Sequence, residues 1–289
     1  MQTVLGAFKK PVLPAPTKSW HVSLGNGDFL CCECSIPEAF TKIVVLVHGL
    51  GGSHASNYMI RMSRKLYDKK IMAVRVNLRG CGTGVALSSL PYHGGRSDDI
   101  LAVLKALKAQ YPNKDIDLVG FSLGANIVLK LAGELSSCVS SYIRSVIAVC
   151  PPLDLAHTVA RMQQKKYGIY HAYFLKKVCQ QAKPWVKTKI NSIYDFDDKV
   201  TARLWGFSGA QDYYKQSSSI YYLSSIQCPC RLLFAQDDPF ISTDIIKAAS
   251  GMPLEVFTTK YGGHMGFLGK TTPEHNFQWL DQQLLEWLD

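Results

Sequence analysis

The stretch IDLVGFSLGA at residues 116–125 places a serine between two glycines, directly after an apolar run. The pattern G-x-S-x-G, formed by Gly120, Ser122 and Gly124, predicts a strand, a very tight turn and the start of a helix. A Cβ atom two residues before or after the serine would collide at such a turn. The residues ANIVLKLA at 125–132 continue as a helix. The stretch therefore predicts a reactive serine at the carboxyl edge of a parallel sheet, and a buried structural turn is the alternative.

Apolar runs that suit strands buried on both faces recur along the chain. They lie at residues 42–47, 71–78, 144–149, 230–235 and 254–258. Helical patterns alternate with them: one begins with Ser97 or Asp98 as its N-terminal cap, and the last runs from Glu274 to Leu288. One face of that last helix carries Phe277, Leu280, Leu284 and Leu288. This alternation specifies the α/β class, with a mostly parallel central sheet and helices on both faces.

One segment departs from the alternation. Between Pro151 and Ile226 no convincing buried strand is found, and the composition shifts towards Tyr, Phe, Trp, Lys and Gln. We therefore expect a core made of residues 1–150 and 227–289, with a helical insertion at 151–226 that forms a lid over the carboxyl edge of the sheet. The alternative is a set of ordinary helices packed on the side of the core.

The composition favours a protein that is neither exported nor membrane-spanning. No uncharged apolar run of about 18 residues or more occurs in the 289-residue chain, and the first 16 residues lack the apolar stretch of a signal peptide. We therefore expect a cytoplasmic protein whose nine cysteines are reduced and act as small core residues. The cysteines lack paired C-x-x-C units, so no metal site is predicted.

The formal net charge of +10 is spread over local lysine pairs. A nucleic-acid binder would concentrate it in a stripe with interleaved aromatic residues, so we expect no nucleic-acid partner. From this charge we expect, at most, a weak peripheral contact of the protein with an anionic membrane. The glycine-rich stretches at 80–84 and 269–271 do not fit phosphate-binding patterns, so no nucleotide cofactor is expected.

A serine hydroxyl becomes a good nucleophile only when a base takes its proton and an acid orients that base. His264 lies in a glycine-rich loop directly after the last predicted strand, and Asp237 and Asp238 follow the strand that ends at Ala235. Asp238 is the favoured acid, because the small residue Ser242, four positions later, suits the start of a helix. Asp237 is the second choice, and is expected to cap the loop or bond the backbone.

The negative charge that develops on a carbonyl oxygen during acyl transfer needs fixed hydrogen-bond donors. The amide of Leu123, directly after the serine, is one candidate. The other is the amide of Leu50, in the HGLGG stretch at 48–52 that leaves the first long buried strand. His48 is interpreted as a hydrogen-bonded structural residue and not as a second base.

Six motifs resemble those of the α/β-hydrolases, and more narrowly of the branch with the YheT-like bacterial hydrolases and related animal lipases. They are HGLGGS at 48–53, NLRGCG at 77–82, GFSLGAN at 120–126, DFDDKVTA at 195–202, DDPF at 237–240 and GGH at 262–264. The resemblance implies the α/β-hydrolase fold, a triad of Ser122, Asp238 and His264, ester hydrolysis without a metal or cofactor, and a lid between the sixth and seventh strands. Members of this branch carry residues before a His-Leu-Gln-Thr segment that is nearly absent here, so we expect no N-terminal membrane anchor.

These observations together predict a serine hydrolase that cleaves carboxylic esters. Ser122 would attack the acyl carbon, and His264 would move the proton while Asp238 holds it. The aromatic composition of the insertion favours short- to medium-chain acyl esters, lipids included, as substrates. An acyltransferase that uses the same triad, and a non-catalytic ligand-binding protein with the same fold, are the alternatives.

Overall fold

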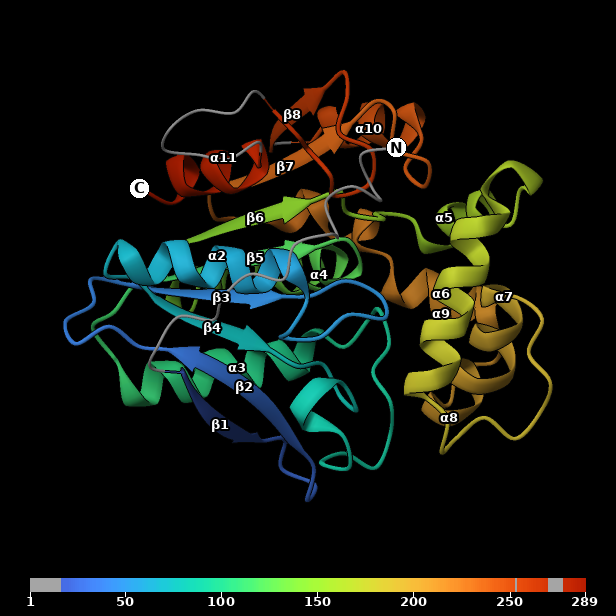
Figure 1. Cartoon of the computed structure of the whole chain (residues 1–289), viewed down its shortest axis with the longest axis horizontal. Helices are drawn as coiled ribbons and strands as arrows, with labels where there is room; N and C mark the ends of the chain where they lie inside the picture. The colour runs from blue at the N-terminus through green and yellow to red at the C-terminus, as the bar shows by residue number, and fades with distance from the viewer. Residues whose placement is uncertain (1–16, 253, 270–277) are drawn as a thin grey trace.

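The computed structural model describes residues 17–252, 254–269 and 278–289, and these residues form one eight-stranded sheet flanked by helices (Figure 1). The strand order is β1-β2-β4-β3-β5-β6-β7-β8. The strands are β1 (Thr17–Ser23), β2 (Phe29–Ser35), β3 (Ile43–Val47), β4 (Met72–Val76), β5 (Ile116–Phe121), β6 (Ser145–Val149), β7 (Cys230–Ala235) and β8 (Glu255–Thr259). From β4 to β8 all neighbours are parallel, whereas β2 runs antiparallel to both β1 and β4.

The central part of the sheet, from β3 to β7, is buried on both faces, which explains why these strands are nearly continuous apolar runs. All five residues of β3 are buried. Ile43, Val45 and Val47 pack in the same cluster as residues of α3 (Ser97–Gln110) and α4 (Leu123–Leu135). Val44 and Leu46 point to the other face, where α2 (Asn57–Asp68) and α11 (Trp279–Leu288) cover them.

The structure confirms the α/β class and the strands β3 to β8, of which β3 to β7 are largely buried. The expectation of a buried strand at 254–258 is wrong: β8 lies at the edge of the sheet, and none of its five residues is buried. It corrects the cap of α3: Ser97 is the first helical residue, and Arg96 is the N-cap. In α11, Leu280, Leu284 and Leu288 are buried against the sheet, as predicted. The predicted start of that helix at residues 274–277, with Phe277, lies outside the described residues.

The strands β1 and β2 were not predicted. Most residues of β1 are exposed, so it carries no apolar run that would mark it. In β2 the buried residues are largely three cysteines and a glutamate, at positions 31–34. Such a stretch lacks the branched and aromatic apolar residues that mark a strand in a sequence. Pairing with β4 buries it.

The segment 151–226, all of it described, contains helices and no strand. The helices are α5 (Leu155–Met162), α6 (Gly168–Gln181), α7 (Ile193–Phe196), α8 (Arg203–Trp205) and α9 (Ala210–Ser217). They lie between β6 and β7 in the chain, and Figure 1 shows them grouped beyond the arrowheads of β3, β4 and β6. They share an apolar cluster of their own, which includes Leu123 at the start of α4. Within the described residues, no helix has the length and hydropathy that a bilayer crossing requires.

Candidate active site

Ser122 occupies a strained turn between β5 and α4. Its φ of 52° and ψ of −119° lie in a region that side-chain-bearing residues rarely adopt, and its N–H donates to the carbonyl of Val149 at 2.8 Å. A Cβ at Gly120 would come within 2.5 Å of the Cα of Ala125, and one at Gly124 would collide with the carbonyls of Val47 and His48. Both glycines are therefore required for this turn.

His264 connects the serine to a carboxylate. It lies in the loop after β8; its Nε2 is 2.8 Å from Oγ of Ser122, and its Nδ1 is 2.9 Å from Oδ2 of Asp238. An ionised carboxylate only accepts, so Nδ1 carries the proton and the Nε2 lone pair faces the serine hydroxyl. His264 is 6% exposed and Asp238 is 2% exposed. The carboxyl ends of β5, β7 and β8 thus bring a hydroxyl, an imidazole and a carboxylate into one hydrogen-bonded chain.

The two adjacent aspartates have different partners. Oδ1 of Asp238 accepts from the N–H groups of Phe240 and Ile241 at 2.8 and 3.2 Å, which leaves Oδ2 for the histidine. Asp237 instead accepts from the N–H groups of Gly262 and Gly263 at 2.8 and 2.7 Å. Asp237 therefore ties the histidine loop to the end of β7, and Asp238 orients the imidazole. Ser242, on which the choice between them was based, is the N-cap of α10 (Thr243–Ser250).

The amide groups of the loop after β3 point to one candidate oxyanion donor. The N–H groups of Gly49 and Gly51 donate to the hydroxyls of Tyr58 and Tyr92, and that of Gly52 donates to the carbonyl of Gly49. Within residues 17–252, 254–269 and 278–289, the N–H of Leu50 has no acceptor. The N–H of Leu123, at the first turn of α4, likewise has none within those ranges, as is usual at a helix start.

Both of these leucines line the same pocket as Ser122 and His264. A Cβ at Gly49 would lie 3.0 Å from Cβ of Ser122, so the loop that carries Leu50 packs directly against the serine. The free N–H groups of Leu50 and Leu123 therefore belong to residues that line the pocket of the serine, and their role as oxyanion donors stays a prediction.

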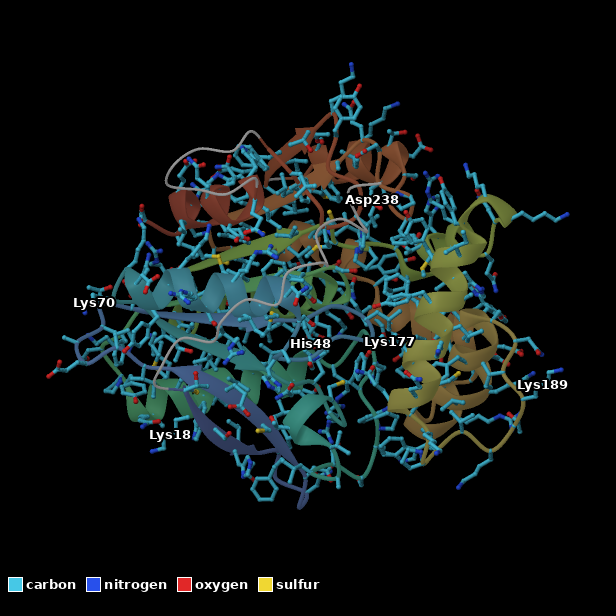
Figure 2. The ribbon with its side chains drawn as sticks, in the orientation of Figure 1. Lys18, His48, Lys70, Lys177, Lys189 and Asp238 are labelled. Carbon is cyan, nitrogen blue, oxygen red and sulfur yellow. The ribbon has the colours of Figure 1, made fainter. Side chains whose placement is uncertain are left out.

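His48 is a structural residue. Its Nε2 accepts from the N–H of Leu78 at 3.2 Å, so the proton is on Nδ1, which donates to the carbonyl of Gly49 at 2.8 Å. Burial lowers the pKa of the imidazole to about 4, so it stays neutral at physiological pH. Figure 2 shows His48 and Asp238 at the end of the sheet that faces the inserted helices. His48 links the loop after β3 to the end of β4.

A largely apolar pocket opens at the serine. Its empty space, including the open mouth, is about 950 Å³. Between the sheet and the inserted helices it is lined by Leu155, Val159, Met162, Phe174 and Val178, which come from α5 and α6. Such a lining suits the aliphatic part of a ligand.

One carboxyl group lines this pocket without having been assigned a role from the sequence. Asp197 begins a π-helical turn, Asp197–Ala202, in a motif that contributed to the family resemblance. Its oxygens accept from the hydroxyl of Tyr214 at 2.8 Å and from that of Thr201 at 3.1 Å. Burial raises the pKa of the Asp197 carboxyl to about 7, although both hydrogen bonds act in the opposite direction. The signal available in the sequence was the DFDD stretch at 195–198, which belongs to a motif of the family resemblance.

Cys150 is a second residue that sequence reasoning did not place at the site. Potential ligand atoms of Cys150, Asp238 and His264 lie within 4.8 Å of one another. Both ring nitrogens of His264 are engaged, one with Asp238 and one with Ser122. Burial, with the nearby Asp238 carboxylate, raises the pKa of the Cys150 thiol well above its usual range, so it remains a neutral thiol. This donor set fits a hydrogen-bonded triad better than a metal centre.

Comparison with known proteins agrees with this geometry. A family model described as alpha/beta hydrolase fold matches residues 42–227. The chain is 27% identical to the putative esterase YheT of Escherichia coli, over 100% of this chain and 89% of that protein. It is also 27% identical to the monoacylglycerol lipase of Saccharomyces cerevisiae, over 78% of this chain and 54% of the lipase. The solved esterase Pf2001 of Pyrococcus furiosus has the same fold, with a TM-score of 0.62 and 19% identity over 97% of this chain and 98% of that one.

Proposed function

This chain belongs to the α/β-hydrolase superfamily, in the branch of the YheT-like esterases, and on that premise we propose that it hydrolyses carboxylic esters through Ser122, His264 and Asp238. One observation carries the proposal: the imidazole of His264 is hydrogen-bonded at once to the serine hydroxyl, at 2.8 Å, and to a buried carboxylate, at 2.9 Å. A fold that only binds ligand would not need this connected donor and acceptor chain.

In the first half-reaction, Nε2 of His264 takes the proton of Ser122 as Oγ attacks the acyl carbon. The carbonyl oxygen becomes negative, and the amides of Leu50 and Leu123 stabilise it. One such donor lowers the barrier by about 3 to 4 kcal/mol. The tetrahedral intermediate then collapses. The C–O bond to the alcohol breaks, and the proton on Nε2 passes to the leaving oxygen, which leaves an acyl-enzyme.

In the second half-reaction, His264 takes a proton from water, which attacks the acyl-enzyme. The same amides stabilise the second oxyanion, and the proton returns to Oγ of Ser122 as the acid leaves. Asp238 keeps the proton on Nδ1 throughout and stabilises the imidazolium when it forms. Each step reuses the same hydrogen bonds.

The substrate is an ester with a short- to medium-chain acyl group, and the segment 151–226 acts as a lid over it. This part of the proposal rests on the apolar pocket lining supplied by α5 and α6. The aliphatic chain is removed from water there, at a gain of about 0.8 kcal/mol for each buried CH₂ group.

The test is a series of p-nitrophenyl esters from acetate to palmitate, with Ser122→Ala as the control. We expect kcat/KM to rise with chain length, to pass through a maximum and to fall for the longest chains. A profile without a maximum would remove the chain-length argument, and equal turnover by Ser122→Ala would remove the triad. Repeating the assay with added alcohol, and measuring the ester formed, separates hydrolysis from acyl transfer.

A further inference from the structure

The segment from Arg161 to Lys189 carries eight basic residues and no acidic one. They are Arg161, Lys165, Lys166, Lys176, Lys177, Lys183, Lys187 and Lys189. This short segment therefore contributes a charge of +8, while the whole chain has a net charge of +10. Arg161 lies at the end of α5, Lys165 and Lys166 lie in the turn before α6, Lys176 and Lys177 lie on α6, and the other three lie in the loop after it.

The helix α6 has two distinct faces. Phe174, Val178 and Gln181 line the pocket that contains Ser122. On the other face, residues at positions i, i+3, i+4 and i+7 are exposed; they are Ile169, Ala172, Tyr173 and Lys176. The two faces belong to one helix, and none of the four exposed residues lines the pocket.

The outer face combines exposed apolar side chains with basic side chains that form no ion pair. The side chains of Ile169 and Tyr173 are 88% and 57% exposed. Among the described residues, none of the eight basic side chains forms an ion pair. Figure 1 shows the loop after α6 at the outer edge of the molecule, and Figure 2 shows Lys189 on that loop. Lys177 instead packs beside the Gly51 loop, so it is not counted in the outer face.

We propose that this outer face binds the surface of an anionic lipid bilayer. The face consists of Lys165, Lys166, Lys176, Lys183, Lys187 and Lys189 together with Ile169 and Tyr173, and is called the basic face below. Clusters of four to eight basic residues give about 1 kcal/mol each near an anionic surface, and exposed apolar tips insert among the headgroups. The inference goes beyond the proposed function, because such binding requires no catalysis.

Lipid explains the composition of the basic face better than nucleic acid does. A phosphate-backbone site requires cations, but it gains nothing from an aliphatic tip such as Ile169 at the centre of the cluster. A lipid surface uses both the charge and the tip.

The test measures sedimentation of the Ser122→Ala protein with vesicles of phosphatidylcholine, with and without phosphatidylglycerol. We expect binding only to the anionic vesicles, weakening as salt is raised. The double variant Lys165→Glu/Lys166→Glu should bind at least about 25-fold more weakly, since each neutralised lysine lowers partition about five-fold. Ile169→Asn should also weaken binding. Because the side chain of Ile169 is exposed, we expect this variant to fold normally.

The matched control is Lys18→Glu/Lys105→Glu, which changes the same charge at exposed positions on β1 and α3. It should lose far less binding than the basic-face variant. Equal losses, or no preference of the parent protein for anionic vesicles, would overturn the inference, as would binding of single-stranded RNA in place of vesicles. With Ser122 restored, the basic-face variants should hydrolyse p-nitrophenyl acetate normally, because none of these residues lines the pocket. Vesicle binding without any ester hydrolysis would refute the proposed function and leave this inference standing.

Discussion

Oδ2 of Asp238 lies 2.9 Å from Nδ1 of His264, and the other oxygen of the same carboxylate is held by two backbone N–H groups. The aspartate therefore cannot rotate without losing hydrogen bonds, and the imidazole it holds is fixed in one tautomer. The orientation of the imidazole towards Ser122 therefore depends on this carboxylate.

Replacing Asp238 with asparagine should lower kcat/KM for ester hydrolysis by about 10⁴-fold. The amide can present an N–H to the imidazole, which favours the tautomer that cannot accept the serine proton. Asp237→Asn is the matched control, because its remaining oxygen can still accept from Gly262 and Gly263. The assignment is wrong if Asp237→Asn costs as much activity as Asp238→Asn.

Gly124→Ala should destabilise the protein by roughly 2 to 3 kcal/mol and abolish most of its activity. The added Cβ would meet the carbonyls of Val47 and His48, the latter at 2.5 Å, and would push the serine turn away from the loop after β3. Gly168→Ala is the control, since a Cβ there meets nothing within 4 Å and the residue starts α6. Urea unfolding should show a normal midpoint for Gly168→Ala and a lowered one for Gly124→Ala.

Enlarging Val178 to phenylalanine should shift the chain-length optimum towards shorter esters. Val178 is buried in α6 and lines the pocket, so the larger ring occupies space that an acyl chain would fill. The ratio of kcat/KM for octanoate to that for acetate is the measurement, and we expect it to fall about tenfold or more. An unchanged ratio would mean that the acyl chain does not lie along α6.

Asp197→Asn should stabilise the protein at alkaline pH more than at acidic pH. The pKa of the Asp197 carboxyl is raised to about 7 in the folded chain, above its ordinary value of 3.8, so the folded state binds the extra proton between these two values. Stability from this group is thus present below pH 4 and is lost as pH rises through 7, by up to a few kcal/mol. Asparagine does not titrate and can still accept from Tyr214.

Thermal unfolding of the two proteins between pH 5 and pH 8 measures this difference. We expect the variant to gain in Tm relative to the parent protein as pH rises. A difference in Tm that is constant over this range would show that ionisation of Asp197 does not lower the stability of the folded protein.

The central fold was predictable because its signals are local. The run at β3 is apolar throughout and that at β7 is apolar except for Arg231, since helices cover both faces of the sheet there. The glycines around Ser122 follow the G-x-S-x-G pattern, although only the contacts of Gly120 are local; those of Gly124 are with Val47 and His48. The hairpin of β1 and β2 was missed because its stability comes from pairing with β4, which is remote in sequence.

The same distinction applies to the site. The sequence predicts Ser122 from its glycine turn, and His264 from its place after the last strand. An acid between them in the chain is predicted from the end of the strand at 230–235, and the position of Ser242 favours Asp238 over Asp237. Cys150 and Asp197 could not be placed, because only the packing of the sheet end against the inserted helices brings them to the site. The run of basic residues at 161–189 is visible in the sequence, but only the structure shows which of them lie on the exposed side of α6.

The most direct test of the account is covalent labelling with a fluorophosphonate, followed by mass-spectrometric mapping of the modified peptide. The account predicts one adduct, on Ser122, formed by the parent protein and lost almost entirely in both Ser122→Ala and His264→Ala. A parent protein that is folded but not labelled, or an adduct on any residue other than Ser122, would contradict it.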